Sequence, residues 1–291
     1  MNAVILAAGT SSRFVPLSFE RPKALLEVKG EILIERQIRQ LREAGVNEIV
    51  IVVGYKKEMF DYLIDKFGVQ LVFNPDYARY NNISSLMCVL EYLGDTYICS
   101  SDNYFVDNVF LREPQESEYA AVYAHGETNE YCLDVDQDDN IVNVSVGGKD
   151  AWYMVGHVFF HSTFSTKFKP IMESAYKDEG NRKKYWEDIY IAHIADLPKM
   201  KVNRFGDEVI KEFDSLEELR SFDSKYEQSG SQILSYISEK LNCKETDICN
   251  ISQVNNGLLH AFTFMSHTKG ESETYLYYEN EGSRHIESIN K

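Results

Sequence analysis

The sequence predicts an α/β protein with a doubly wound, mainly parallel sheet, an antiparallel extension and a small C-terminal α+β appendage. Apolar runs typical of buried strands alternate with helical patterns over residues 3–74, and strands of alternating polarity follow from residue 118. A polar stretch, Gln228-Ser229-Gly230-Ser231, then resembles a linker. We therefore expect two domains, residues 1–228 and residues 229–291.

Composition excludes several classes of protein. The formal charge of −16 argues against a nucleic-acid partner, which needs an excess of Lys and Arg on one face. No run approaches the roughly 18 apolar residues of a membrane span, and the apolar start is too short for a signal peptide, so we expect no membrane insertion. The sequence leaves a homo-oligomer open.

Cysteine and histidine spacing gives no sign of a disulfide framework or a zinc site. The five cysteines are odd in number and lack C-x-x-C spacing, which makes a reducing cytoplasm the expected location. His157 and His161 lie in a predicted strand, where their rings would be ~13 Å apart, too far to share a metal.

The first part of the chain follows a β-α-β-α-β pattern. We expect strands at 3–8, 48–53 and 70–74 and helices at 34–44 and 57–67. Ligands of such sheets bind beyond the carboxyl ends of the strands. The loop that follows the first strand is therefore the first place to look for a site.

That loop has the residues of a phosphate-binding segment. Gly9, Thr10, Ser11 and Ser12 let backbone N–H groups approach an anion. Arg13 is a planar donor for phosphate oxygens, and a lysine ten residues later, in Pro22-Lys23-Ala24-Leu25, adds a point charge. A polyphosphate fits this set, and the alternative is a tight strand-to-helix turn with solvated charges.

The loop resembles the signature of the nucleotidyltransferases that join a nucleoside triphosphate to a phosphate ester, roughly G-x-G-x-R-x-x-P-x-[ST]-x-x-x-P-K. The matching residues are Gly9, Arg13, Pro16, Ser18, Pro22 and Lys23. Ser11 departs from the pattern, which usually has a second Gly there, and a Ser fits if its φ stays negative. The resemblance implies a Rossmann-like fold, with Arg13 and Lys23 catalytic and with nucleotide contacts at Leu6, Ala8, Gly9, Thr10, Ser11, Ser12 and Arg13.

A second run narrows the resemblance. Tyr-x-x-Tyr-Asn-Asn-x-x-Ser-Leu, residues 77–86, is similar to a run in the bacterial choline-phosphate cytidylyltransferases. It implies nucleotide contacts at Asn82 and Ser84, since an amide offers the donor and acceptor that a cytosine edge needs. The alternative is simple capping of the helix that follows.

Two aspartates are candidate ligands of Mg²⁺, the cofactor that the resemblance implies. Asp102 ends the predicted strand 95–101, where a catalytic and metal-binding carboxylate is expected, and it matches the family's first metal ligand. Asp214, in Glu212-Phe213-Asp214-Ser215, matches the second. Their alternative roles are a turn cap for Asp102 and a helix N-cap for Asp214.

The antiparallel extension and two helices follow. Strands are expected at 120–124, 131–135, 141–144 and 154–161. Helices are expected at 164–175 and 185–195.

The acceptor is expected to bind to aromatic and acidic residues from this region. The resemblance implies that its cationic group contacts Tyr131, Tyr185, Trp186, Glu187 and Asp188. The alternative is that Trp186 is a core residue and its neighbours form a solvated face.

The tail, with a predicted helix at 233–241, weakly resembles the start of the small lobe of bacterial choline kinases, in Asn255–Leu258 and Tyr275–Gly282. No catalytic lobe follows in this sequence, so we expect no kinase activity. For the chain as a whole the resemblance implies transfer of a cytidylyl group from CTP to phosphocholine. The alternatives are another acceptor, a sugar 1-phosphate or 2-aminoethylphosphonate, and a non-catalytic nucleotide-binding protein.

Overall fold

The computed structural model describes residues 1–254, 257–268 and 271–289 and divides into two compact units. The first unit contains Met1–Gly9 and Ile32–Glu212, and the second contains Thr10–Glu31 and Phe213–Lys291. These units do not coincide with the predicted domains, because residues 10–23, called the signature segment below, and residues 213–228 group with the C-terminal residues.

The first unit is built on a seven-stranded sheet of order β10-β8-β9-β6-β1-β4-β5. β1 pairs in parallel with β4 and β6, and β9 runs antiparallel to both of its neighbours, β6 and β8. This confirms the mainly parallel, doubly wound fold class. The strands are β1 (Asn2–Ala7), β4 (Glu48–Val53), β5 (Gln70–Phe73), β6 (Thr96–Ser100), β8 (Glu118–Val135), β9 (Ile141–Phe160) and β10 (Lys201–Phe205), with β7 (Asn103–Phe105) and β11 (Ile210–Glu212) paired in a small second sheet.

The strand order reverses between β1 and β6. From β1 the chain adds β4 and β5 on one side and then returns to β6 on the other. Leu6 lies opposite Ser100 in this pair, and the Ser101 N–H donates to the Leu6 carbonyl at 3.3 Å. The carboxyl ends of β1 and β6 therefore adjoin at the reversal point, where ligands of such sheets bind.

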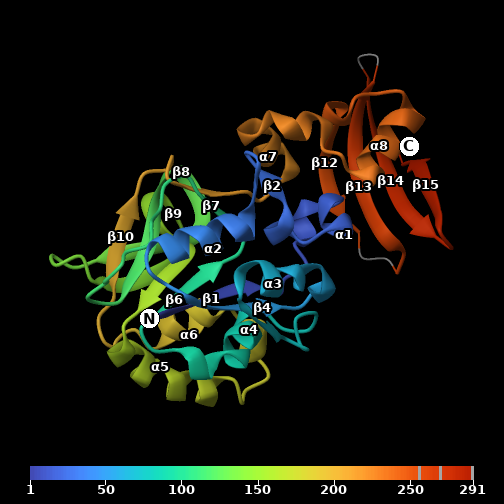
Figure 1. The fold of residues 1–291 in the computed structure, drawn as a ribbon. Coiled ribbons are helices and arrows are strands. Elements are labelled where there is room, and N and C mark those ends of the chain that lie inside the picture. Colours follow the sequence, from blue (N-terminus) through green and yellow to red (C-terminus); the bar gives the residue numbers. More distant parts are fainter. Residues whose placement is uncertain (255–256, 269–270, 290–291) are drawn as a thin grey trace. The chain divides into compact units, whose positions relative to one another are not determined.

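Helices cover both faces of the sheet (Figure 1). α2 (Leu33–Glu43) lies on one side, and α4 (Asn82–Cys88), α5 (Ser162–Ala175) and α6 (Trp186–Ala192) lie together on the other. The predicted helix at 57–67 is split into a 3₁₀ turn, Lys57–Phe60, and α3 (Tyr62–Phe67). Further 3₁₀ turns are Leu90–Tyr92 and Asn181–Lys183. Among the described residues, no helix combines the length and apolarity needed to cross a membrane.

The antiparallel extension is longer and simpler than predicted. The runs 120–124 and 131–135 belong to one strand, β8, and the runs 141–144 and 154–161 belong to β9, which ends one residue before His161. Shifts of register between β8 and β9 near Gly126 and Gly147, both with positive φ, let each strand continue where alternation of polarity is interrupted.

The two histidines have unrelated surroundings. His157 is buried, with Nδ1 at 3.7 Å from the Cys99 Sγ, and burial lowers its pKa to about 3.

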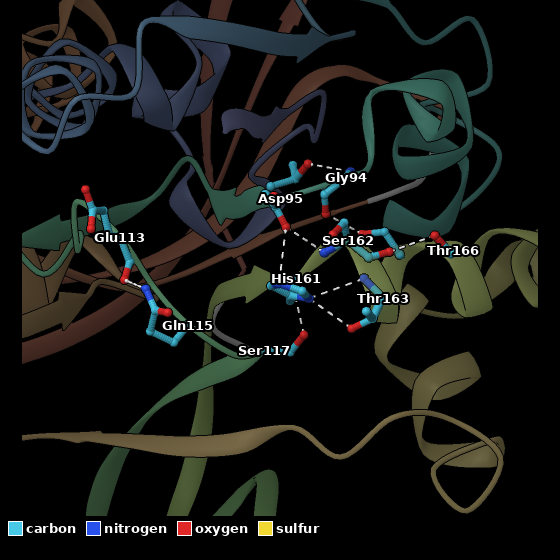
Figure 2. A network of polar contacts seen from close by, with 11 residues as sticks. Gly94, Asp95, Glu113, Gln115, Ser117, His161, Ser162, Thr163 and Thr166 are labelled. Carbon is cyan, nitrogen blue, oxygen red and sulfur yellow. Dashed lines mark hydrogen bonds and ion pairs between the residues drawn. The ribbon is translucent and has the colours of Figure 1, made fainter.

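His161 caps α5, and Figure 2 shows its polar network with Asp95 and Ser117. The Asp95 carboxylate accepts from the Ser162 N–H at 2.7 Å, and the His161 N–H donates to the Ser117 hydroxyl at 2.9 Å. Since Asp95 precedes β6, this network lies at the amino end of β6, whereas the reversal point lies at its carboxyl end.

The second unit contains the signature segment and the C-terminal sheet. Its sheet has the antiparallel order β12 (Ile248–Gln253), β13 (Leu259–Thr268), β14 (Glu271–Asn280) and β15 (Ser283–Ser288). Its helices are α1 (Leu17–Glu20), α7 (Leu216–Phe222) and α8 (Gln232–Leu241), with 3₁₀ turns at Ser12–Phe14, Lys23–Leu25, Ser224–Gln228 and Glu245–Asp247. The short β2 (Glu27–Val28) and β3 (Glu31–Ile32) form a hairpin.

The predicted linker at 228–231 is ordered. Ser231 is 1% exposed and caps α8, and the Ser229 hydroxyl donates to the Glu245 carboxylate at 2.7 Å. Asn255 and Asn256, part of the kinase-like run, lie outside the described residues.

Candidate active site

Asp102 lies at the reversal point of the sheet. It occupies the turn between β6 and β7, directly after the Ser101 that bonds to the end of β1. The neighbouring Asn103 is fully buried, and its amide donates to the Val155 carbonyl at 2.6 Å. This bond fixes the turn, so the backbone that carries Asp102 is held beside the end of β1, as the sequence predicts.

The end of β1 is also held closely by the end of β4. The Tyr55 N–H donates to the Ala8 carbonyl at 3.1 Å. A Cβ on Gly54 would lie 2.7 Å from that carbonyl oxygen and 2.6 Å from the Tyr77 Cβ, so only glycine fits there. The backbone at the end of β1 is therefore closely packed against its neighbours. Leu6, Ala8 and Gly9, which are predicted to contact the nucleotide, belong to this part of the chain.

The predicted acceptor residues and Asn82 come together in the first unit. The Asn82 amide oxygen accepts from the Trp186 N–H at 2.8 Å, and its nitrogen donates to the Glu187 carboxylate at 3.1 Å. The other oxygen of Glu187 accepts from the Tyr119 hydroxyl at 3.2 Å. One amide thus joins the start of α4 to the start of α6.

Glu187 is a buried carboxylate without a cation. It is 7% exposed, and no ion pair to it or to Asp188 is found in the part of the chain that the structure describes. Burial raises the pKa of Glu187 to about 7, although the Asn82 and Tyr119 hydrogen bonds act in the opposite direction. Two adjacent acids without a counter-ion are costly to the folded protein and attractive to a cationic ligand.

Tyr131, Tyr185 and Asp188 form the more accessible part of this group. The Tyr131 hydroxyl donates to one oxygen of Asp188 at 2.9 Å, and the Tyr185 N–H donates to the other at 2.9 Å. The two tyrosine rings meet edge to face at 6.3 Å, and Tyr185 is 44% exposed. The structure thus joins a residue of β8 to the start of α6, the convergence on which the predicted acceptor site depends.

Trp186 and Ser84 are both buried, whereas a side chain that contacts a ligand needs to be accessible. Trp186 is 2% exposed, and its ring packs against the rings of Tyr119, Phe160 and Phe168, as a core residue does. Ser84 is 2% exposed, accepts from the Asn74 amide and donates to the Asn81 carbonyl. Both side chains are buried, and their predicted ligand contacts stay predictions.

Sequence reasoning missed Tyr119 and Asn74, which hold Glu187 and Ser84. The signal for Tyr119 was its position in a strand, next to the apolar run 120–122. Asn74 was assigned only to the end of β5, and nothing in the sequence indicated its partner.

In the second unit, Arg13 and Asp214 form an ion pair. The Arg13 Nη1 lies 2.8 Å from the Asp214 Oδ1, and the two side chains are 72% and 37% exposed. Such an exposed pair contributes little to stability. Both groups can therefore exchange this partner for a ligand at small cost.

Asp214 is not the N-cap of the helix that follows. Ser215 takes that role, since its hydroxyl accepts from the Glu218 N–H at 3.2 Å. The alternative role for Asp214 is thus excluded, which leaves its carboxylate to pair with Arg13.

Lys23 is held against the residue before Asp214. Its ammonium group donates to the Phe213 carbonyl and lies 5.0 Å from the centre of the Phe14 ring, and the residue is 6% exposed. Phe14 was not singled out from the sequence. Arg13 and Lys23 of the signature segment thus both contact Phe213-Asp214.

Ser11 does not meet the condition of a negative φ. Its φ of 51° and ψ of 47° are left-handed, not the negative φ that a serine prefers. A glycine, which the family signature usually has here, would adopt this conformation without the steric cost that a serine has.

The described residues contain no group of three or more His, Cys, Asp or Glu that could hold a metal ion. Mg²⁺ commonly binds one or two carboxylates together with substrate phosphates and water, so Asp102 and Asp214 suit it by type and number.

Comparison with known proteins identifies the family. The family model described as "MobA-like NTP transferase domain" matches residues 3–185, more than half of the chain. The chain belongs to this family. It is a nucleotidyltransferase with the Rossmann-like fold of that group.

Individual relatives and a solved structure agree with this assignment. The chain is 37% identical over 223 residues to the choline-phosphate cytidylyltransferase of Streptococcus pneumoniae, covering 77% of this chain and 97% of the relative. It is also 37% identical over 229 residues to the 2-aminoethylphosphonate cytidylyltransferase of Lancefieldella rimae, covering 77% and 93%. The solved CTP:phosphocholine cytidylyltransferase of S. pneumoniae superposes with a TM-score of 0.74, covering 77% of this chain and 97% of that chain.

The first prediction concerns Glu187. Its folded-state pKa of about 7 exceeds the model-peptide value of 4.5, so the folded protein binds more protons between these pH values and loses stability as pH rises through them. Glu187→Gln removes that loss. The difference in free energy of unfolding, variant minus wild type, should therefore be larger at pH 8 than at pH 5, by on the order of 1–3 kcal/mol.

Urea unfolding at both pH values measures this difference. Glu173→Gln, an exposed acid of α5, is the control and should show no such change. An equal difference at pH 5 and pH 8 for Glu187→Gln would show that Glu187 ionises normally.

The second prediction concerns Ser11. Ser11→Gly removes a left-handed serine, a cost of about 1–2 kcal/mol, against a loss of about 0.5–1 kcal/mol for the added freedom of glycine when unfolded. The variant should unfold at the same or a slightly higher temperature and keep full nucleotide affinity. A clear drop in melting temperature would mean that the loop does not have this conformation.

Proposed function

We propose that this protein transfers the cytidylyl group of CTP to phosphocholine and releases CDP-choline and pyrophosphate. One observation carries the choice of acceptor. Two adjacent acids, Glu187 and Asp188, lack a cationic partner among the described residues and lie beside the paired rings of Tyr131 and Tyr185. The choice of CTP is supported by two relatives, a choline-phosphate cytidylyltransferase and a 2-aminoethylphosphonate cytidylyltransferase.

The chemistry of a trimethylammonium group fits these residues. It has no N–H to donate, so its binding depends on aromatic faces and on nearby negative charge. The two oxygens of Asp188 already accept hydrogen bonds from Tyr131 and Tyr185, while the charge itself stays unpaired. Such a carboxylate attracts a cation without needing a directed bond from it.

The reaction needs positioning and neutralisation of charge more than it needs a base. The acceptor phosphate, with a second pKa near ~6, is largely a dianion at neutral pH. Its oxygen forms a bond to the α-phosphorus of CTP as the bond to the β-phosphate oxygen breaks, and pyrophosphate leaves with that electron pair. Arg13 and Lys23 offset the negative charge of the triphosphate during this step.

Mg²⁺ is proposed as the cofactor, with Asp102 and Asp214 as its protein ligands. When bound, it would supply charge stabilisation and orientation at the triphosphate. For Asp214, the support is that Ser215 takes the capping role and that the Arg13 pair is exposed.

2-Aminoethylphosphonate is the second candidate acceptor, because the relative from L. rimae is as similar as the one from S. pneumoniae. Its primary ammonium group asks for directed acceptors. Both Asp188 oxygens already accept a hydrogen bond from the protein, which favours phosphocholine because its trimethylammonium group needs no directed acceptor.

We propose a cytoplasmic location. The support is the choice of CTP as substrate and the five cysteines, all described and all unpaired. The absence of a nucleic-acid partner stays a prediction from the charge.

Pyrophosphate release with CTP, Mg²⁺ and a panel of acceptors tests the proposal. We expect the highest kcat/KM with phosphocholine, ahead of phosphoethanolamine, 2-aminoethylphosphonate and sugar 1-phosphates. A preference for 2-aminoethylphosphonate would overturn the choline assignment. No release with any acceptor would favour a non-catalytic protein.

The third prediction tests the catalytic role of Lys23. Lys23→Met removes the ammonium group and should lower kcat/KM about 100-fold or more, as loss of one electrostatic partner commonly does. Lys240→Met, an exposed lysine of α8, is the control. Unchanged kcat/KM in the folded Lys23 variant would refute the role.

The fourth prediction tests the acceptor site. Tyr131→Ala loses a ring worth about 1–2 kcal/mol to a bound cation, which corresponds to a rise of roughly 5–30-fold in KM for phosphocholine. The KM for CTP should stay within about twofold. Tyr123→Ala, from the same strand, controls for damage to β8, and an equal rise in both KM values for Tyr131→Ala would contradict the assignment.

A further inference from the structure

The signature segment and the C-terminal residues belong to one compact unit. Thr10–Glu31, which carries Arg13 and Lys23, groups with Phe213–Lys291. Between the two cations lies α1, which is seen beside the C-terminal sheet in Figure 1. The sequence predicted instead that residues 229–291 form an appendage beyond a linker.

A carboxylate of α1 is held at the start of α8. The Glu20 Oε1 accepts from the Ser231 hydroxyl at 2.6 Å and from the Ile233 N–H at 3.0 Å. A negative charge at this end of a ten-residue helix is favourable, because the first backbone N–H groups lack partners within the helix. Ser231 is 1% exposed, so water competes poorly for this contact.

An aromatic contact joins α1 to the C-terminal sheet. The Phe19 ring stacks on His260 of β13, with centroids 4.7 Å apart, and lies 6.1 Å from the ring of Phe262. His260 is in turn fixed by Glu279 of β14, whose carboxylate is 2.7 Å from the His260 Nδ1. Phe19 is 9% exposed.

The segment has little freedom once α1 is fixed. Two residues, Arg21 and Pro22, separate Glu20 from Lys23, and three residues separate Arg13 from Leu17. Prolines at 16 and 22 restrict the backbone on both sides of α1. A shift of α1 would therefore move both cations, and small displacements of groups that bind the reacting phosphates are expensive for catalysis.

We propose that residues 229–291 position the phosphate-binding segment, with Glu20 and Phe19 of α1 as the positioning residues. The C-terminal region then sets the affinity for the nucleoside triphosphate through its contacts with α1. This inference rests on the proposed function for the choice of CTP and for the effect on turnover, but the effect on CTP binding can be measured whether or not the acceptor reacts.

The test compares full-length variants by calorimetric titration with CTP and Mg²⁺ in the absence of acceptor. Glu20→Ala removes the acceptor of both hydrogen bonds and should weaken CTP binding by roughly fivefold or more, given the cost of misplaced phosphate contacts. Glu20→Gln keeps an acceptor oxygen and should recover part of that loss. Tyr236→Phe removes a hydrogen bond to the Arg284 carbonyl within the C-terminal region and is the control, with CTP affinity unchanged.

Kinetics separate positioning from a loss of folded protein. Positioning predicts that Glu20→Ala raises KM for CTP while KM for phosphocholine at saturating CTP stays within about twofold. A lower kcat with both KM values unchanged, or CTP affinity within twofold of the wild type, would overturn the proposal. Weakened CTP binding in a protein that releases no pyrophosphate with any acceptor would support positioning and refute the proposed transferase reaction.

Discussion

The Asn82 amide is the interaction on which the acceptor side of the first unit depends. It accepts from the Trp186 N–H and donates to the Glu187 carboxylate, so a single side chain sets where α6 begins relative to α4. The start of α6 carries Tyr185 and Asp188, and Asp188 in turn binds Tyr131 of β8. Without these two hydrogen bonds, the acidic and tyrosine side chains that we assign to the acceptor would not be held in fixed positions relative to one another. The energetic cost is a buried carboxylate, visible in the raised pKa of Glu187.

The unpaired acids explain why stability and binding are opposed here. A protein selected for stability alone would have an uncharged side chain in place of Glu187. A ligand that carries a positive charge offsets the cost of this buried negative charge when it binds. Part of its binding free energy therefore comes from removing a destabilising feature of the protein. This makes the phosphate ester of a cationic alcohol a better fit to the site than the phosphate ester of an uncharged sugar.

Much of this arrangement could be predicted from the sequence, because it depends on local patterns. The buried first strand and the position of Asp102 after a later strand were predicted correctly from spacing and polarity, whereas the roles of the small residues and cations after the first strand stay predictions. Contacts between distant residues could not be read that way. The burial of Trp186, the use of Ser84 by Asn74, the positive φ of Ser11 and the packing of α1 on α8 and β13 depend on tertiary structure, which periodicity does not encode.

Recognition of positive charge by Glu187, Asp188 and the two tyrosines is the central claim. The most direct measurement compares the binding of phosphocholine with that of 3,3-dimethylbutyl phosphate, which has the same shape and no positive charge, by calorimetry with Mg²⁺ and a non-hydrolysable CTP analogue. The account predicts that phosphocholine binds at least about tenfold more tightly, the equivalent of about 1.4 kcal/mol for a cation against aromatic and acidic groups. Equal affinity for the two compounds would contradict it.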